Sequence, residues 1–253
     1  MEKYVLAVLV MTMLSLSAVS RADESTPLVG NYGIASNYVF RGISQTSEQT
    51  AFQGGLDQAG ATGAYYGIWI SNISWLKDSG AYTSSHFELD GYGGYKGAIG
   101  RSDFGYDVGG IAYYYDGQHN GNNANTAEIY GALTWQWLSA KLSYPLTDYF
   151  GILDSKGGTY YVDLSANYPL GKTGITLLVH AGHLKLSGSA PASADNDSLY
   201  AYTDWKLGAS YSLAKDTTIG AYYTGTNAIA ANYTFLGKNW ADSQYVIYLQ
   251  QTF

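Results

Sequence analysis

Cysteine is absent from this sequence of 253 residues, charged residues make up only 13% of it, and no long apolar run follows residue 22. Without cysteine, disulfides cannot stabilise the folded chain, so another device must do so. No later stretch approaches the roughly 18 apolar residues that indicate a membrane-crossing helix, which excludes a helical membrane protein. The charged fraction is well below the roughly 25% typical of soluble domains. The net charge of −7 argues against a nucleic-acid partner.

Tyrosine and glycine are abundant instead, at 26 and 31 residues. Tyrosine favours strands and interfaces between water and an apolar phase. Glycine in strands marks bends and bulges, which curved sheets need. The composition favours an all-β protein, and closure of its sheet into a barrel would stabilise the chain without disulfides by removing free edges.

Residues 1–22 have the pattern of a secretory signal peptide. Lys3 stands in a short n-region, residues 5–19 are apolar apart from three hydroxyl residues, and Ser20 and Ala22 are the small residues before a cleavage site. A membrane helix is the alternative, but the run is shorter than the roughly 20 residues that a span needs. We expect removal of 1–22 on export. No linker or repeat divides the rest, so we expect 23–253 to form one domain.

Twelve segments alternate between apolar and polar residues and are separated by turn residues, which predicts twelve strands. In one of them Val162 and Leu164 lie on one face, whereas Asp163 and Ser165 lie on the other. The predicted strands are 29–40, 51–59, 64–72, 86–96, 104–115, 126–136, 138–147, 159–168, 174–185, 203–213, 217–225 and 242–253.

The connections between these strands alternate in length. The long ones are 41–50, 73–85, 116–125, 148–158, 186–202 and 226–241, and the short ones are 60–63, 97–103, the position around Trp137, 169–173 and 214–216. Short periplasmic turns and longer outer loops are typical of membrane barrels. In lipid every backbone polar group must be paired within the protein, so a strand protein must close on itself. The predicted fold is a single transmembrane antiparallel β-barrel of about 12 strands.

Aromatic residues near the predicted strand ends are candidates for the girdles that such barrels place at the two membrane interfaces. The alternative for each is simple core packing. The candidates are Phe40, Trp69, Trp75, Trp135, Trp137, Tyr149, Phe150, Trp205, Trp240 and Phe253.

Several motifs carry a resemblance to a known family. They are Asn37–Thr46, Gln53–Asp57, Tyr66–Asn72, Glu88–Tyr92 and Leu138–Tyr144, the last leading into Asp148–Gly151. These segments resemble the proteobacterial Gcw_chp family, whose members are also called TorF-family porins. The resemblance spans most of residues 23–253 and is most specific in its first third. It implies an outer-membrane barrel and little about chemistry.

The last predicted strand resembles the closing strand of bacterial outer-membrane barrels, in which a terminal Phe is part of the assembly signal. Tyr245, Ile247, Leu249 and Phe253 form its apolar face, although Gln251 departs from the pattern. An ordinary strand of a soluble sandwich is the alternative. The resemblance implies the bacterial outer membrane as location and, as partners, its lipid, lipopolysaccharide and the barrel-assembly machinery. The sequence does not indicate an oligomeric state.

The inward face predicted from the alternation is acidic. Asp57, Glu88, Asp90, Asp107, Glu128, Asp163 and Asp204 stand against Lys96, Lys141 and Lys206. Acidic rings favour cations in pores, so a passive porin-like channel for small polar solutes or cations is the leading hypothesis. The alternative is a plug, in which carboxylates and lysines bridge a narrow lumen and close it.

Arg41 falls at a strand end beside the first outer loop. Its planar fork of five donors suits a carboxylate or a phosphate. We expect Arg41 to clamp this loop through an inward carboxylate such as Asp57. Contact with a solute or with a lipopolysaccharide phosphate is the alternative.

Signals for catalysis are weak. His180 and His183 share a strand but face opposite ways, and no nucleophile motif is present. A barrel lipase would need Ser165 or Ser210 beside His180. The oxygen-rich loop 116–123 lacks the final Glu of a calcium loop. We therefore expect no enzyme activity, cofactor or metal. A non-conducting surface barrel is the second hypothesis, and a lipid-acting enzyme is the third.

Overall fold

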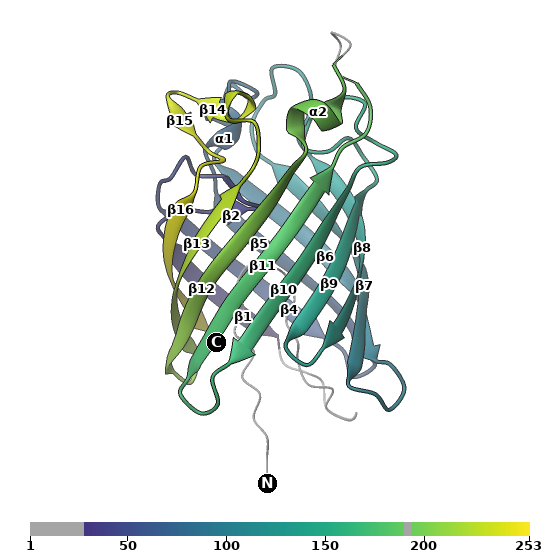
Figure 1. Ribbon diagram of the computed structural model, residues 1–253, viewed down its shortest axis with the longest axis vertical. Coiled ribbons are helices and arrows are strands. Elements are labelled where there is room, and N and C mark those ends of the chain that lie inside the picture. Colours follow the sequence, from purple (N-terminus) through teal and green to yellow (C-terminus); the bar gives the residue numbers. More distant parts are fainter. Residues whose placement is uncertain (1–27, 190–193) are drawn as a thin grey trace.

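The computed structural model describes residues 28–189 and 194–253, so the expected signal peptide lies outside the described residues. Twelve antiparallel strands close into a barrel (Figure 1), which confirms the predicted fold. The wall consists of β1 (Val29–Ala35), β4 (Ala51–Ala59), β5 (Ala64–Asn72), β6 (Phe87–Ala98), β7 (Phe104–Tyr115), β8 (Thr126–Trp135), β9 (Leu138–Pro145), β10 (Tyr160–Pro169), β11 (Ile175–Lys185), β12 (Tyr202–Ala214), β13 (Thr217–Thr226) and β16 (Gln244–Thr252).

Closure occurs between β1 and β16. Asn31 pairs with Thr252 and Ala35 pairs with Tyr248, whereas the other edge of β1 pairs with β4. Every wall strand therefore has two neighbours, as a strand protein in lipid requires. Within the described ranges, neither helix has the length and hydropathy that a membrane-crossing helix needs.

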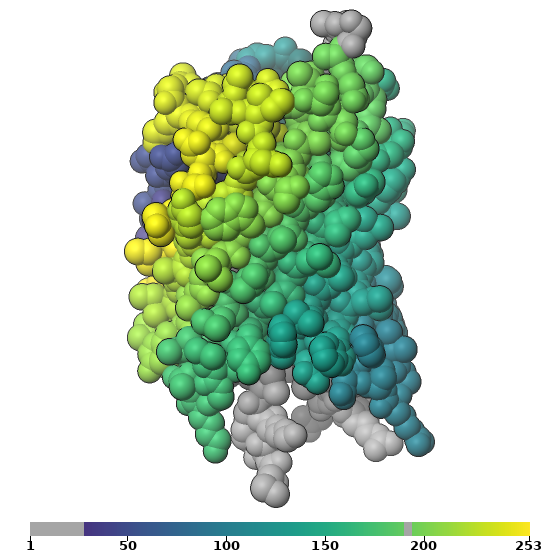
Figure 2. Space-filling view, viewed as in Figure 1, coloured from purple at the N-terminus to yellow at the C-terminus, as the bar shows by residue number. Residues whose placement is uncertain are grey.

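The two ends of the barrel differ. Short turns and the C-terminus lie at the lower end in Figure 1, which we call the turn end, and the long connections gather at the other, the loop end. The loop end carries α1 (Trp75–Asp78), α2 (Asn196–Tyr200), the 3-10 helix η1 (Ala230–Asn232) and the hairpin of β14 (Thr234–Phe235) and β15 (Lys238–Asn239). In the space-filling view the yellow segment with the β14–β15 hairpin and the green segment with α2 stand at the upper end of the barrel (Figure 2). The predicted alternation of connection lengths is confirmed.

The wall buries its polar face and exposes its apolar face, the reverse of a soluble protein. On β16, Tyr245 is 79% exposed and Ile247 also points outward, whereas Gln244 beside Tyr245 is 8% exposed. On β10, Leu164 is exposed and Asp163 is buried. An apolar exterior around a polar interior is the pattern of a barrel that stands in lipid.

The first predicted strand is wrong in its second half. β1 ends at Ala35, and residues 36–50 turn into the barrel as a loop with a short hairpin, β2 (Val39–Phe40) and β3 (Ile43–Ser44). The alternation of residues 36–40 fits a strand, but Asn37 instead donates to Gln244 and accepts hydrogen bonds from two hydroxyls of its own loop. These polar contacts outweigh local strand propensity.

Most of the proposed girdle residues do not face lipid. Trp135, Trp137, Trp205 and Phe253 are exposed, as expected for a girdle. The others pack inside the barrel or beneath its loops: Phe40, Trp69, Trp75, Tyr149, Phe150 and Trp240. Phe40, for example, meets Tyr113 and Phe150 edge to face. An aromatic residue near a strand end suits either place, so sequence position alone does not separate the two.

Candidate functional site: the lumen and its inward hairpin

Arg41 occupies the tip of the inward hairpin. It donates from Nη1 to Glu128 Oε1 at 2.9 Å and from Nη2 to Glu128 Oε2 at 2.7 Å. The two side chains are only 7% and 1% exposed. Such a two-pronged contact is the strongest pairing that a guanidinium and a carboxylate make. It fixes the hairpin to β8 inside the lumen.

Aromatic rings surround this ion pair. Arg41 also donates to the Tyr149 hydroxyl at 3.1 Å, and its guanidinium carbon lies 4.8 Å from the Phe40 ring centre and 4.4 Å from that of Tyr161. The prediction that Arg41 binds Asp57 is wrong. Asp57 instead accepts a 2.5 Å hydrogen bond from Tyr92. Arg41 reaches Glu128 because residues 36–50 enter the lumen, which the predicted strand 29–40 did not allow.

Gly42 permits the close approach of the hairpin to the wall. Its φ of +79° lies in the left-handed region, where a side chain is costly. An added Cβ would stand 2.5 Å from Thr226 Cγ2 and 2.6 Å from Asp204 Cβ. The hairpin tip therefore touches β12 and β13, on the opposite arc of the wall from Glu128.

Carboxylates and tyrosines share the arc of the lumen below the hairpin. Tyr38 donates to Glu88 Oε1 at 2.9 Å, and Tyr113 donates to Glu128 at 3.4 Å. Asp90 is buried beside Glu88, and its Oδ1 has no hydrogen-bond donor among the described residues. Glu88 and Glu128 are thus both hydrogen-bonded to tyrosine hydroxyls of the lumen.

His180 on β11 lies between two aspartates. Its Nε2 is 2.8 Å from Asp204 Oδ1 and its Nδ1 is 3.3 Å from Asp163 Oδ2. Ser165 donates to Asp163 at 2.6 Å, and Tyr161 donates to Asp204 at 2.8 Å. Both ring nitrogens can donate to a carboxylate only when the imidazole carries two protons, so this arrangement is typical of a charged imidazolium. The alternation placed these aspartates inward but did not reveal that His180 joins them.

The serine–histidine–aspartate contact is not arranged as a nucleophile and its base. Ser165 Oγ is 3.1 Å from His180 Nδ1, but its proton is directed to Asp163. A general base needs a free acceptor nitrogen, and both nitrogens of His180 are engaged. His183 faces outward and contacts Thr203, as expected from the spacing of the two histidines. The geometry favours a structural ion cluster in the lumen wall.

Three lysines also point inward. Lys96 stands beside Asp107 in the register of β6 and β7 and over the Tyr65 ring, and Tyr65 donates to Asp107 at 2.5 Å. Lys141 on β9 and Lys206 on β12 have tyrosine rings as neighbours instead of carboxylates in contact. The three lysines are distributed around the lumen instead of forming one patch.

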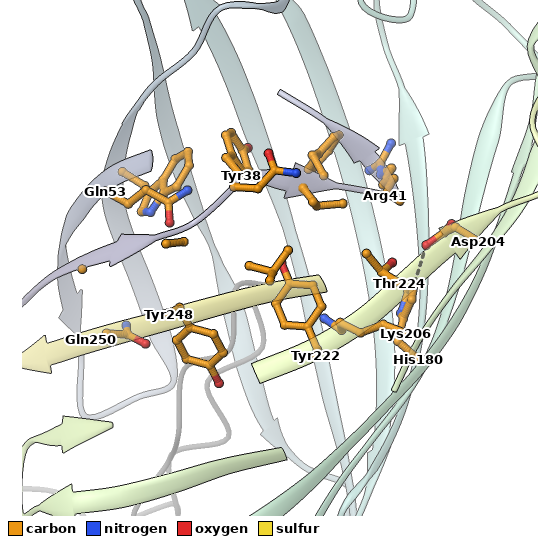
Figure 3. A pocket seen from close by; sticks show the side chains of 18 of the residues that line it. Tyr38, Arg41, Gln53, His180, Asp204, Lys206, Tyr222, Thr224, Tyr248 and Gln250 are labelled. Carbon is orange, nitrogen blue, oxygen red and sulfur yellow. Dashed lines mark hydrogen bonds and ion pairs between the residues drawn. The ribbon is translucent and has the colours of Figure 1, made fainter. Parts of the chain in front are cut away.

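A cavity of about 180 Å³ lies in the lumen against the hairpin. Figure 3 shows Tyr38 and Arg41 on one side of it and Lys206, Tyr222 and Tyr248 on the other. Asp90, Lys141, Asp163 and Asp204 line it as well. The space is therefore bounded by charged side chains, amides and tyrosine rings.

The charge balance of the lumen is less acidic than the sequence suggested. Arg41 and His180 add to the three lysines, and each expected carboxylate except Asp90 accepts a hydrogen bond from a described side chain. A carboxylate paired with a cation attracts a passing cation less than a free one, because its charge is compensated. Glu128, Asp163 and Asp204 are paired in this way, whereas the tyrosine hydroxyls that donate to Asp57, Glu88 and Asp107 are neutral and leave the charge in place. The structure thus weakens the basis on which cation preference was expected.

The oxygen-rich loop after β7 has a structural contact. Asp116 Oδ1 accepts from the backbone N–H of His86 at 2.6 Å and of Phe87 at 2.9 Å. Burial alone would raise the pKa of Asp116, but these hydrogen bonds outweigh it and hold the pKa below its ordinary value. Among the described side chains, no group of three or more metal-ligating residues is placed to hold a metal ion.

The proposed assembly face lies on the outside of β16. Tyr245, Ile247, Leu249 and Phe253 all point outward and are exposed. Tyr245 stacks on Tyr223 of β13 with ring centres 4.4 Å apart. Its role in assembly stays a prediction.

The comparisons with known proteins agree with this architecture. A sequence profile described as "Bacterial protein of unknown function (Gcw_chp)" matches residues 20–253. No curated protein matches significantly. Among solved structures, a KdgM porin is 13% identical with a TM-score of 0.54, covering 89% of this chain and 99% of that one. An outer membrane channel from Pseudomonas putida F1 is 12% identical with a TM-score of 0.50, covering 92% and 96%. At such identities the likeness shows the fold.

Proposed function

The chain belongs to the Gcw_chp family of bacterial proteins, and from its closed barrel and polar lumen we propose that it is a passive, porin-like channel for small polar solutes. The observation that carries this proposal is the cavity of about 180 Å³ inside a wall with an apolar exterior. Solutes would diffuse through the lumen and be selected by its width and charges. Location in the outer membrane, after export directed by residues 1–22, is part of the proposal.

The inward hairpin lies across the lumen and would narrow the proposed path at that level. Arg41 and Glu128 join the hairpin to one arc, and Gly42 contacts Thr226 and Asp204 on the other. Only small solutes would pass this level. Liposome swelling tests the proposal: purified protein should admit glycerol and small sugars, and should exclude a large oligosaccharide. Equal swelling rates with and without folded protein would contradict it.

A non-conducting surface barrel is the second candidate, because the loop end is well packed. Leu184, Leu186, Tyr202, Trp240 and Ala241 form part of a buried cluster at the loop end of the barrel. A buried cluster makes the loop end rigid. A rigid loop end could form a binding surface for a partner or a rim around a pore. The swelling assay separates the two candidates. A lipid-acting enzyme has no support from the His180 cluster, which offers no free base.

A further inference from the structure

Asp90 on β6 lines the cavity with an oxygen that lacks a partner. Its side chain is 1% exposed, and among the described residues nothing donates a hydrogen bond to its Oδ1. Asp163 and Asp204, the other carboxylates of the lining, both contact His180 instead. A buried carboxylate oxygen without a donor is unfavourable, because burial removes water that nothing replaces. A bound group that donates to Oδ1 would therefore stabilise this part of the lumen.

The charged neighbours of Asp90 are themselves acidic. Glu88 lies two residues earlier on the same strand, within hydrogen-bonding reach, and Glu128 is the next carboxylate. Glu128 is paired with Arg41, but Glu88 accepts from the neutral hydroxyl of Tyr38 and keeps its charge. Two adjacent carboxyl groups that share one proton still carry one negative charge, so this pair attracts a cation in either state.

The cationic side chains that line the cavity stand on other parts of the wall. Lys206 on β12 is six strands from β6 in either direction round the barrel, and Lys141 on β9 is three strands away. Both lysines interact electrostatically with Asp163, and Arg41 is bound by Glu128. Among the described groups, the electrostatic contacts of Asp90 include none of these cations. The charge of Asp90 is therefore left for a ligand to compensate.

Aromatic rings flank Asp90 on both neighbouring strands. Asp90 pairs with Trp69 of β5 and with Tyr113 of β7, so the three buried side chains point into the lumen side by side. Residues opposite each other in this way have Cβ atoms about 5 Å apart. Trp69 and Tyr113 line the cavity, as does Tyr92 two residues further along β6. The face of such a ring attracts a cation.

The rest of the lining indicates which cation fits. Gln53 Nε2 and the Tyr248 hydroxyl also lack partners among the described residues and line the cavity (Figure 3), but both are neutral. Calcium and magnesium need about six oxygen ligands, and the described side chains form no group of three or more metal-ligating residues. An organic ammonium needs only one charged acceptor for its N–H group and ring surface for its carbon atoms.

We propose that the lumen binds a small organic ammonium at Asp90, with an N–H group donating to Oδ1 and its carbon skeleton against the rings of Trp69 and Tyr113. The proposal names a solute class for the channel. Binding does not require conduction, so only the passage of the ligand rests on the proposed function.

Calorimetry on detergent-solubilised, folded protein tests the site. Benzylamine, which is protonated at neutral pH, is the probe, and benzyl alcohol is its uncharged match. Benzylamine should bind, and benzyl alcohol should bind at least about tenfold more weakly, because it cannot form a charge-assisted hydrogen bond. Asp90→Asn should weaken benzylamine binding by a similar factor. Asp103→Asn, the same change in the exposed turn between β6 and β7, is the control and should leave binding unchanged.

Thermal unfolding separates a binding role of Asp90 from a structural one. Saturating benzylamine should raise the thermal midpoint of the native protein and of Asp103→Asn, but not of Asp90→Asn. Without ligand, Asp90→Asn should not lower the midpoint, because it removes a buried charge that has no cation. A difference in gel migration between boiled and unboiled samples verifies that each variant is folded.

The site proposal is overturned if benzylamine does not bind, if benzyl alcohol binds equally well, or if Asp90→Asn binds like Asp103→Asn. The comparison of benzylamine with benzyl alcohol uses the native protein, so it decides the matter if Asp90→Asn fails to fold.

Bilayer recording separates this proposal from the channel itself. Benzylamine hydrochloride added to a potassium chloride bath should reduce the current through the native protein and not through Asp90→Asn. Benzylamine binding in detergent with no conductance would overturn the channel and support the site. Conductance without benzylamine binding would support the channel and overturn the site.

Discussion

Arg41 and Glu128 are separated by 87 residues in sequence and are joined by two hydrogen bonds inside the lumen. Because of this pair, the first long loop lies inside the lumen and not around its outer rim. A surface ion pair contributes little, but this one is enclosed, so removal of either partner leaves an uncompensated charge. The position of the hairpin, and with it the width of the lumen, depends on the pair.

Removal of the Glu128 charge should release the hairpin. Glu128→Gln leaves Arg41 enclosed without a counter-charge, at a cost of about 3–5 kcal/mol. We expect a larger single-channel conductance, because residues 36–50 would leave the lumen. Asp103→Asn, in an exposed turn at the other end, is the control. Unchanged conductance in Glu128→Gln would mean that the hairpin does not limit the path.

A second prediction concerns the fit of Gly42 against the wall. Gly42→Ala and Gly80→Ala both place a side chain at positive φ, which costs about 1–2 kcal/mol. An added Cβ at Gly80 meets nothing within 4 Å, whereas at Gly42 it meets Thr226 and Asp204. Gly42→Ala should therefore lower the thermal midpoint more than Gly80→Ala does. Equal shifts would show that the hairpin tip is loosely held.

The wall could be predicted from the sequence because alternation with period two specifies the face of every side chain once a strand is recognised. Asp163 and Leu164 illustrate this, since both lie where the pattern placed them. Arg41 could not be placed in the same way, because residues 36–40 alternate like a strand and yet fold inward. Their position depends on Asn37 and Gln244, which are far apart in sequence.

A charged residue on the outer, lipid-facing side of the wall should destabilise the protein. Leu207 on β12 is 60% exposed on the outside of the wall. Leu207→Lys should lower the free energy of unfolding by about 2–4 kcal/mol if the residue stands near the bilayer midplane. Leu236→Lys is the control, because Leu236 is 80% exposed at the β14–β15 tip, away from the wall. Urea titration in liposomes measures both. Equal effects would argue against a membrane-embedded wall.

Phe253 should matter more for assembly than for stability. Its ring is 71% exposed and lies 6.1 Å from the Tyr32 ring, so its packing within the protein contributes less than the ~1.5–3 kcal/mol of a fully buried side chain. The resemblance of strand 242–253 to closing strands implies the larger role in assembly. Phe253→Ala should reduce the folded protein in the membrane fraction of cells more than Phe104→Ala, another exposed aromatic. Normal levels of Phe253→Ala would count against that role.

The loop end should respond to acid through Asp116. Because its pKa is lowered in the folded protein, its stabilisation is present above the ordinary aspartate pKa and is lost as pH falls through the lowered value. Amide protection at His86 and Phe87 should persist at neutral pH and fall below about pH 4. Asp116→Ala should lower this protection at neutral pH, and the difference from the native protein should disappear in acid, where Asp116 is protonated. Protection unchanged by the substitution would refute the role of these hydrogen bonds.

The lumen chemistry was only partly predictable. The spacing of His180 and His183 separated their faces, but it did not show that Asp163 and Asp204 meet His180 from two neighbouring strands. Counting inward charges also overstated acidity, because the count does not show which carboxylates are bound. Pairing depends on register between strands, and a single sequence does not specify that register.

Single-channel recording in planar bilayers tests the central claim most directly. Folded native protein should give discrete current steps, and Glu128→Gln should give larger steps. Bilayers that contain heat-modifiable, folded barrel but show no steps, for the native protein and for Glu128→Gln alike, would contradict the channel and favour the non-conducting surface barrel.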